Sequence, residues 1–309
     1  MTDFTVAICT YNGSKTLSQV LDKLRSQANV EQLNWEILVI DNNSTDDTAK
    51  IVETYQLVWT ESYPLKYFFE PQQGLAFARR CAIQESNSPL IGFLDDDNLP
   101  EENWVAAAYS FAQEHPQAGA YGGQIHGKFE VEPPANFGRI ARFFALIEGD
   151  HTYCYNEKYQ NSKIRMFPPG AGIVIRKQAW LESIPPQPLL PQTNEDLEML
   201  SQIWQQGWQI WFNAQMHLDH LIPASRFEKS YLKKFFRQNG LMRYYVRMLR
   251  YKPWQQALMT PVYLVNDLKK LIMHLLKYRK VLKTDVVAIG EMELLIGIVL
   301  SPFFAVKKN

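Results

Sequence analysis

Three carboxylates stand side by side in the segment "FLDDDNLP" (93–100), directly after an apolar run. Like charges repel one another, so Asp95, Asp96 and Asp97 are unfavourable together unless a cation lies among them. Hard oxygen ligands of this kind bind Mg²⁺ or Mn²⁺, and such ions bridge to phosphate oxygens. The alternative is a solvated acidic loop that caps the next helix. Because the acids follow a predicted buried strand, we favour the cation site; which carboxylates face the ion stays open.

Two more acids, Glu195 and Asp196, open a predicted helix in "NEDLEMLSQIWQQG" (194–207), which Gly207 ends. A carboxylate in such a place can act as a general base that takes the proton of an attacking hydroxyl group. Acids in the first turn of a helix also stabilise it through the helix dipole, with no part in catalysis. Taken alone, the pair favours this structural interpretation.

A lone carboxylate, Asp41, follows the apolar run "ILVI" (37–40). In nucleotide-binding sheets, an acid at the end of the second strand commonly accepts hydrogen bonds from ribose or base. The residues "DNNS" (41–44) equally fit a turn or a helix cap. A dinucleotide cofactor is not expected, because the loop after the first strand reads "TYNGSKT" (10–16) and lacks the GxGxxG pattern.

Short apolar runs alternate with segments of helical spacing through the first hundred residues. The predicted strands are 4–9, 35–40, 65–70 and 90–94. Predicted helices follow at 15–27, after a capping box of Ser44 and Asp47, at 74–85, and from Pro100 onward. This alternation predicts an α/β fold with parallel strands and crossover helices. Because ligands bind at the carboxyl ends of such strands, residues 10–14, Asp41 and the acidic cluster should converge at one edge.

Composition excludes several classes of protein. The chain has 309 residues, 46% of them hydrophobic, which suits one large or two smaller folded domains and excludes wholesale disorder. Its three cysteines are scattered without zinc-binding spacing, so we expect reduced thiols. Residues 1–15 lack the basic and apolar regions of a signal peptide, so we expect the protein in the cytoplasm.

Charge divides the chain near residue 225. Residues 1–225 hold 15 Lys and Arg against 27 Asp and Glu, whereas residues 226–283 hold 15 against two. We therefore expect a first domain at 1–225 and a basic helical region at 226–309. Such a positive surface requires an anionic counterpart, and an anionic membrane surface fits better than nucleic acid.

The apolar segment 294–306 supports the same location. It is interrupted by Pro302 and is shorter than the ~20 residues that span a bilayer, so an interfacial helix is expected there. With the basic region, it predicts a peripheral position at the inner face of the plasma membrane. The alternative is a helical extension packed on the first domain or on a second subunit of a homo-oligomer.

Six segments occur in a characteristic order: "VAICTYNGSKTL", "ILVIDNNSTDDT", "QQGLAFARRCAI", "GFLDDDNLP", "PPGAGIVIRKQAW" and "NEDLEMLSQIWQQGW". Through these segments, residues 4–225 resemble family 2 glycosyltransferases. Members of this family have the glycosyltransferase-A fold, which is a single Rossmann-like domain with a mostly parallel sheet. Within the family, the chain resembles bacterial enzymes of polysaccharide assembly, including the cyanobacterial hormogonium polysaccharide type. The resemblance implies metal-assisted, inverting transfer of a sugar from a nucleotide diphosphate sugar, and a UDP-sugar is the expected donor. The acceptor would be a hydroxyl group of a growing glycan or lipid-linked saccharide.

The resemblance also implies roles on the donor side. It assigns to the nucleotide pocket Thr10, Tyr11, Asn12, Asp41, Gly74 and Arg79. Asp95 and Asp97 match the outer carboxylates of the DxD motif, on the ribose and metal side, and Asp96 stands where the family has a small residue. The metal would be Mg²⁺ or Mn²⁺, with Asp97 and His220 as ligands and Arg226 as a phosphate contact. His217 fits the family pattern less well.

On the acceptor side, the resemblance assigns the general base to Asp196, with Glu195 beside it. Gly170 and Gly172 would let the backbone approach the acceptor or the donor sugar closely. A simple bend before a strand is the alternative for these two glycines.

Two other functions compete with sugar transfer. A phosphotransferase of the haloacid dehalogenase type would carry its acids on the first strand and would need Thr or Val where Leu99 stands. A non-catalytic nucleotide-sugar-binding protein is disfavoured, because every acidic position that the family pattern requires is filled.

Overall fold

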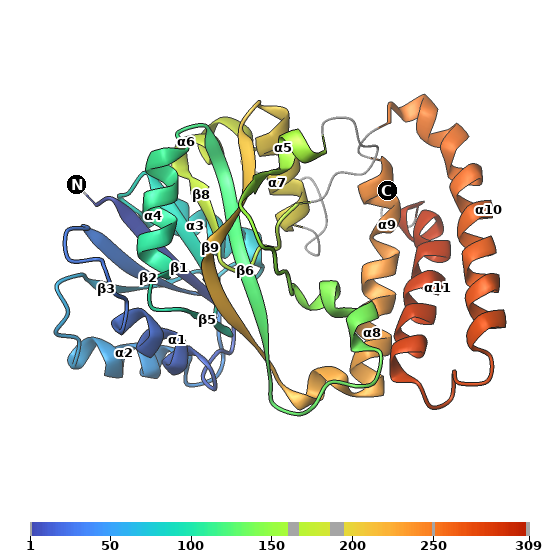
Figure 1. Ribbon diagram of the computed structural model, residues 1–309, viewed down its shortest axis with the longest axis horizontal. Coiled ribbons are helices and arrows are strands. Elements are labelled where there is room, and N and C mark those ends of the chain that lie inside the picture. The colour runs from blue at the N-terminus through green and yellow to red at the C-terminus, as the bar shows by residue number, and fades with distance from the viewer. Residues whose placement is uncertain (1, 160–166, 186–194, 249–250, 307–309) are drawn as a thin grey trace. The chain divides into compact units, whose positions relative to one another are not determined.

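The computed structural model describes residues 2–159, 167–185, 195–248 and 251–306 (Figure 1). The chain forms two compact units. Unit 1 comprises Met1–Lys128 and Ala145–Leu221, and unit 2 comprises Phe129–Phe144 and Ile222–Asn309. Unit 1 contains every predicted site residue except Arg226, and unit 2 contains the basic region together with a segment that the charge pattern did not assign to it, residues 129–144.

The first four strands of unit 1 run parallel, in the order β3-β2-β1-β4. Their bounds are β1 (Phe4–Thr10), β2 (Trp35–Asp41), β3 (Leu65–Phe69) and β4 (Leu90–Asp95). The register pairs Thr10 with Asp41 and Cys9 with Asp95, so the carboxyl ends of β1, β2 and β4 are level. The predicted α/β fold and the convergence of these strand ends at one edge are therefore confirmed.

Beyond β4 the pairing becomes antiparallel. β8 (Ile173–Arg176) pairs antiparallel with β4, and β6 (Ala118–Phe129) pairs antiparallel with β8. β9 (Gln209–Ile222) lies next to β6, and both β5 (Asn98–Pro100) and β7 (Tyr153–Cys154) pair antiparallel with β9. The pairing of β5 with β9 brings the end of a distant strand beside the acidic cluster.

Helices cover both faces of this sheet (Figure 1). One core cluster joins Val6 and Ile8 of β1 to α1 (Leu17–Arg25), α2 (Thr48–Leu57) and α4 (Trp104–Glu114). The opposite cluster joins Ala7 and Ile40 to α3 (Leu75–Glu85), α6 (Lys177–Ser183) and α7 (Glu195–Gln205). The short α5 (Tyr155–Lys158) follows β7. Because successive strand residues point to opposite faces, strands covered on both sides are apolar throughout, as β1 and β2 are.

Two local predictions are wrong. Ser44 and Asp47 form no capping box: α2 begins at Thr48 without a side-chain cap, and the Ser44 hydroxyl accepts the backbone N–H of Asn12 instead. Pro100 does not open a helix, because it ends β5, and α4 begins only at Trp104. A proline has no N–H to donate, so it is tolerated at the end of a short edge strand.

Unit 2 is helical, and its positive charge is partly neutralised internally. Its elements are η1 (Phe137–Arg139), η2 (Ala141–Phe144), η3 (Ala224–Phe227), α8 (Lys229–Leu241), α9 (Arg243–Met248), α10 (Pro253–Tyr278) and α11 (Val286–Val306). Ion pairs join Arg237 to Glu293, Arg247 to Asp267, and Arg139 to Glu291. A side chain at Gly240 would overlap with the backbone of α11, so α8 and α11 pack with their backbones in close approach.

The apolar segment 294–306 was predicted to be too short to span a bilayer, and this prediction is wrong. The segment belongs to the continuous helix α11, which passes through Pro302, and its part Val286–Phe304 is long and apolar enough to cross a membrane, with mean hydropathy 1.9. The same helix also resembles a core helix: Val287 and Ala288 are fully buried, and Glu293 is buried in its ion pair with Arg237.

Candidate active site

The carboxylate at the end of β2 holds the turn that follows this strand. Asp41 is buried, and its carboxylate accepts the backbone N–H of Ser44 (2.9 Å) and the hydroxyl group of Tyr67 (2.8 Å). Burial, followed by this bond to Asp41, raises the pKa of Tyr67 to about 12. Asp41 thus holds the turn that "DNNS" suggested, and its oxygens keep lone pairs for a ligand hydroxyl group.

The loop after β1 is held in a defined shape. Asn12 adopts a left-handed backbone (φ 57°), its N–H donates to Ser44, and its side-chain oxygen accepts the N–H of Thr45 (2.8 Å). The neighbouring Tyr11 side chain is 48% exposed at this edge. The structure therefore brings together Thr10, Tyr11, Asn12 and Asp41, as the predicted nucleotide pocket requires.

Gly74 marks the start of α3 and is fixed by a residue that sequence reasoning did not name. Its N–H donates to the side-chain oxygen of Asn42 (2.6 Å), and the Asn42 amide donates to the carbonyl of Gln72 (2.7 Å). Gly74 has φ 140°, which favours glycine. Asn42 thus connects the end of β2 to the start of α3, and the "DNN" turn was the only sequence signal for it.

The three acids of the cluster take different partners. Asp96 accepts the hydroxyl hydrogen of Thr10 (2.5 Å), and Asp97 lies 3.4 Å from Nε2 of His220. Burial, followed by the charge of Asp97, raises the pKa of Asp95 to about 7, although Arg79 opposes the shift. Asp96 is therefore turned toward β1, whereas Asp95 and Asp97 share the remaining negative charge.

The donor atoms here suit a divalent cation. Asp95 and Asp97 offer carboxylate oxygens, and His220 reaches Asp97 because β5 pairs Asn98 with His220. Burial, followed by the charge of Asp97, disfavours the ionised form of Asp95, and a bound cation would offset both effects. Oxygen-rich donors with one imidazole fit Mn²⁺ or Mg²⁺.

Asp196 lies at the start of α7, where its carboxylate is close to the guanidinium group of Arg79 and to the backbone of Gly170. Arg79, only 3% exposed, donates from Nη1 to Oδ1 of Asp196, whose side chain is still 39% exposed. A side chain at Gly170 would overlap with both carboxylate oxygens of Asp196. Asp196 also contributes to the raised pKa of Asp95, so the predicted base and the acidic cluster lie within electrostatic reach of each other. The side chain of Glu195 lies outside the described residues.

Gly172 has a structural role. Its backbone is left-handed (φ 65°), and a side chain there would overlap with Leu218. These observations match the simple bend before β8.

Arg226 lies in η3 of unit 2, and its predicted phosphate contact stays a prediction.

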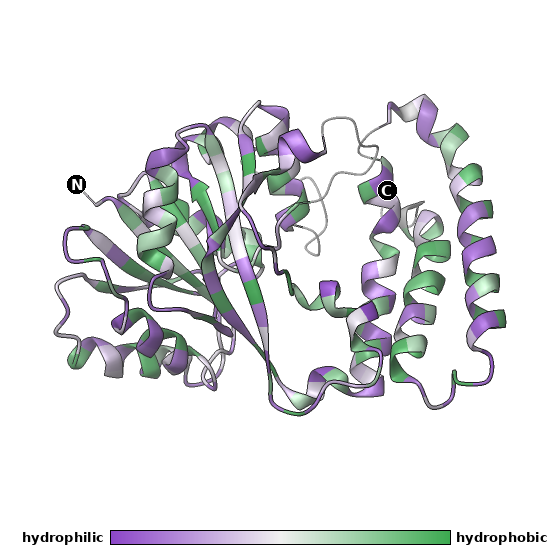
Figure 2. Ribbon diagram, viewed as in Figure 1, coloured by the Kyte–Doolittle hydropathy of each residue, from purple (hydrophilic) through white to green (hydrophobic). Residues whose placement is uncertain are grey.

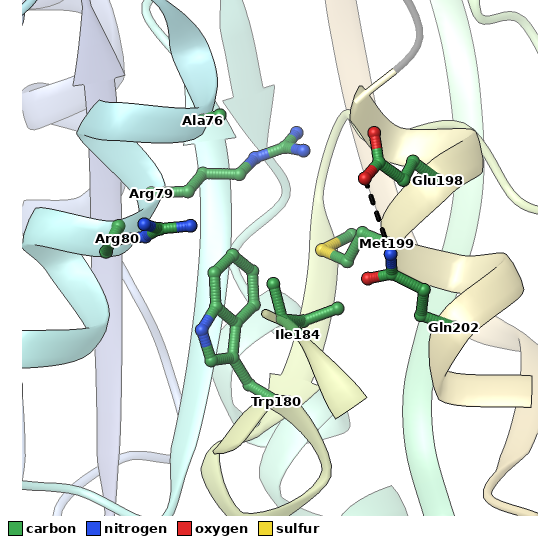
Figure 3. A pocket seen from close by; sticks show the side chains of 8 residues that line it. All are labelled: Ala76, Arg79, Arg80, Trp180, Ile184, Glu198, Met199 and Gln202. Atoms are coloured by element: carbon green, nitrogen blue, oxygen red, sulfur yellow. Dashed lines mark hydrogen bonds between the residues drawn. The ribbon is translucent and has the colours of Figure 1, made fainter. Parts of the chain in front are cut away.

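An open pocket has the Arg79 side chain in its wall (Figure 3). The pocket is lined by side chains of α3, α6 and α7 and by Ile184, which follows α6. The lining residues are Ala76, Arg79, Arg80, Trp180, Ile184, Glu198, Met199 and Gln202. Gln202 donates to Glu198 across its α7 wall (3.3 Å). The sequence did not predict this pocket, because its walls join α3 to α6 and α7, which come much later in the chain.

Replacing Gly170 with alanine should lower turnover by roughly 100-fold, the size of effect that a misplacement of about 1 Å produces. The new methyl group must displace the Asp196 carboxylate, since no space exists between them. Steady-state kinetics should show the loss in kcat, with nucleotide affinity retained in a thermal-shift titration. Gly138→Ala is the matched control, because no atom lies within 4 Å of its new methyl group. Wild-type kcat in the Gly170 variant would contradict the role of this contact.

Comparisons with known proteins agree on one family. The model of the family described as Glycosyl transferase family 2 matches residues 5–179. Glycosyltransferase AglE of Haloferax volcanii is 30% identical over 106 residues, which make up 34% of this chain and 34% of AglE. The poly(ribitol-phosphate) β-N-acetylglucosaminyltransferase TarS of Staphylococcus aureus is 27% identical over 115 residues, 37% of this chain and 20% of TarS. The chain thus spans only a third or less of the length of these relatives.

Solved structures show a common fold. The crystal structure of S. aureus TarS superposes with a TM-score of 0.53 at 18% identity, covering 78% of this chain and 39% of that one. GalNAc-T7 with UDP, GalNAc and Mn²⁺ gives 0.53 at 17% identity, covering 77% and 47%. TarS 1–349 with UDP-GlcNAc gives 0.52 at 14% identity, covering 99% and 92%. At these identities the likeness establishes the fold, which is of the glycosyltransferase-A type.

Proposed function

The chain belongs to glycosyl transferase family 2, and we propose that it is a metal-dependent, inverting hexosyltransferase that uses a UDP-sugar. The observation that carries the proposal is the convergence at one sheet edge of Asp41, the acids Asp95–Asp97, and Asp196 with its partner Arg79. One group of side chains can hold a nucleotide diphosphate, and the other can accept a proton from a sugar acceptor.

Donor binding follows from the edge of β1 and β2. Asp41 has acceptor capacity for ribose or base hydrogen-bond donors, and Tyr11 offers an exposed ring beside it. Asp95, Asp97 and His220 would hold the divalent cation, which supplies Lewis-acid stabilisation of the diphosphate leaving group. Two structural neighbours support this donor class, since GalNAc-T7 was solved with UDP, GalNAc and Mn²⁺ and TarS 1–349 with UDP-GlcNAc.

Proton transfer is assigned to Asp196. Its exposed carboxylate can accept the proton of an attacking hydroxyl group, which inversion by direct displacement requires. Arg79 is the positioning residue, because it is buried and donates to one carboxylate oxygen. Gly170 fixes the carboxylate from the other side.

The acceptor is proposed to be a growing glycan or a lipid-linked saccharide. Two relatives carry names that refer to polymers, a poly(ribitol-phosphate) β-N-acetylglucosaminyltransferase and a minor teichoic acid biosynthesis protein of Bacillus subtilis. These names support a polymer as the acceptor. A relation to hormogonium polysaccharide enzymes stays a prediction.

The proposal is tested by incubating the full chain with a panel of nucleotide sugars, with and without Mn²⁺. We expect slow metal-dependent hydrolysis of one UDP-sugar to UDP and free sugar, because water can replace the missing acceptor. A phosphotransferase would release inorganic phosphate instead. A non-catalytic binding protein would be stabilised by the nucleotide sugar without releasing any product.

The helix α10 suggests how the enzyme meets a lipid-linked acceptor, and we propose that it docks on an anionic membrane surface. A stripe of large apolar side chains runs along one face of α10, each more than half exposed: Trp254, Leu258, Val262, Val265, Ile272 and Leu276. Their spacing of three, four or seven residues is that of an interfacial amphipathic helix. Lys269, Lys270 and Lys277 on the same helix supply positive charge. Figure 2 shows hydrophilic and hydrophobic residues interspersed along α10.

Replacing Val262 and Val265 together with glutamate should weaken binding to anionic vesicles at least about tenfold. The change removes two apolar contacts and adds charge of the wrong sign, and each cationic residue near such a surface contributes only about 1 kcal/mol. Co-sedimentation with anionic and neutral vesicles at low and high salt measures the effect. The matched control is Leu57→Glu on α2, which is also exposed. If wild-type protein stays in the supernatant and the variant loses self-association instead, the stripe joins two copies of the chain.

A further inference from the structure

Two histidines meet on neighbouring strands of unit 1, outside the acidic cluster. Nε2 of His126 on β6 lies 3.1 Å from Nδ1 of His217 on β9, and the rings are stacked with centroids 5.4 Å apart. Glu101 completes the group, because ligand atoms of all three residues lie within 4.8 Å of one another. The backbone N–H of Glu101 donates to the carbonyl of His217 (3.0 Å), so the extension of the β5–β9 pairing holds Glu101 in place.

This group is separate from the proposed catalytic site. His217 and His220 are three residues apart on β9, so their side chains point to opposite faces of the sheet. The burial pattern agrees: Met216, Leu218 and His220 are buried, whereas His217 is partly exposed. His220 lies beside Asp97, and His217 lies beside His126.

The neighbouring side chains favour the tautomer of His126 in which Nε2 carries no proton and can bind a ligand. Nδ1 of His126 lies 2.9 Å from the carboxylate of Glu148, which holds a proton on that nitrogen and leaves Nε2 as the acceptor. A carboxylate bonded to the outer nitrogen of a histidine is the usual partner of a metal-bound imidazole. Without a metal, the proton on Nδ1 of His217 joins the two rings, and Nε2 of His217 accepts from Gln124 (3.3 Å).

The spacing of the two nitrogens also fits a shared metal ion. Zinc bound tetrahedrally at about 2.0–2.1 Å from each nitrogen places the two nitrogens roughly 3.3 Å apart. The observed 3.1 Å requires a shift of only a few tenths of an ångström. Metal binding through Nδ1 requires the proton of His217 to move to Nε2, which gives up the hydrogen bond from Gln124 while that amide keeps its bond to the carbonyl of Ala214.

We propose that Glu101, His126 and His217 form a zinc site with Glu148 as the positioning residue. Two imidazoles and one carboxylate match the ligand preferences of Zn²⁺, whereas Mg²⁺ prefers oxygen ligands throughout. Three protein ligands leave the fourth tetrahedral position for water. The ion would join the start of the β5–α4 connection to β6 and β9, and would stabilise the strand that also carries His220 on its other face.

The test uses the full chain stripped of metal, with Zn²⁺ alone for affinity and Co²⁺ as the spectroscopic probe. Equilibrium dialysis should show one tight Zn²⁺ per chain, and Co²⁺ should give the strong visible absorption of tetrahedral coordination. Both signals should persist in Asp97→Ala, which removes a ligand of the other site. They should be lost in His126→Gln and His217→Gln, and Glu148→Gln should weaken Zn²⁺ affinity by about 10–100-fold.

His151→Gln is the matched control, because His151 is exposed in the same unit and outside the group. Circular dichroism establishes that each variant is folded, and Glu101→Gln supplies a further variant that alters only an exposed side chain. Undiminished Zn²⁺ binding in both histidine variants overturns the proposal. Loss of the tetrahedral signal in Asp97→Ala but not in His217→Gln overturns it as well, and moves the ion to the acidic cluster. Neither result bears on sugar transfer, which the nucleotide-sugar assay tests.

Discussion

Replacing Asp97 with alanine should abolish measurable sugar transfer, with a loss of roughly 1,000-fold or more. The change removes a carboxylate that lies beside His220 and contributes to the raised pKa of Asp95, so the cation site loses a ligand and much of its negative charge. A Lewis acid at the leaving diphosphate is worth several kcal/mol of transition-state stabilisation. Turnover of the nucleotide sugar, and thermal shifts with UDP in the presence and absence of Mn²⁺, measure the two consequences.

The matched variant Asp96→Asn identifies which acids serve the cation. Asp96 already accepts the Thr10 hydroxyl group and faces β1, and an amide oxygen can keep that bond. We therefore expect a much smaller loss of Mn²⁺-linked UDP binding than in Asp97→Ala. Equal losses in the two variants would place Asp96 among the metal ligands. Full turnover of the wild-type enzyme in excess chelator would remove the metal from the mechanism altogether.

Replacing Asp196 with asparagine should lower kcat by about 100- to 10,000-fold, the usual contribution of a general base. Asparagine keeps the shape of the side chain and can still accept a hydrogen bond from Arg79, but it cannot take a proton from the acceptor hydroxyl group. Donor binding should remain, because the residues of β1 and β2 that we propose to contact the nucleotide do not belong to α7. Steady-state kinetics with a fixed acceptor, together with UDP titration, separate the two effects.

Two further acids serve as controls for Asp196. Glu195→Gln tests the neighbouring carboxylate at the start of α7, and Glu114→Gln alters an exposed acid at the end of α4. We expect near-normal turnover in Glu114→Gln and a smaller loss in Glu195→Gln than in Asp196→Asn. A large loss in Glu195→Gln with near-normal turnover in Asp196→Asn would transfer the role of base to Glu195.

The main strands and the acids at their ends could be predicted from the order of residues alone. Apolar β-branched runs followed by helical spacing place strands at 4–9, 35–40 and 90–94, and the structure has them within a residue or so. Asp41 and Asp95 are the last residues of β2 and β4, and each directly follows an apolar run in the sequence. Parallel strands then bring such ends to one edge, a general property of α/β sheets that needs no coordinates.

Which distant side chains meet depends on how the strands pair and pack in three dimensions. Gly170 lies against Asp196, and His220 reaches Asp97 through the antiparallel β5–β9 pair, which the strand–helix alternation did not predict. His217 resembles His220 in sequence, but the register of β9 turns it toward His126 on the other face. Periodicity is a local property that a few neighbouring residues reveal, whereas strand register depends on packing across the whole sheet, and a shift of one residue exchanges its two faces.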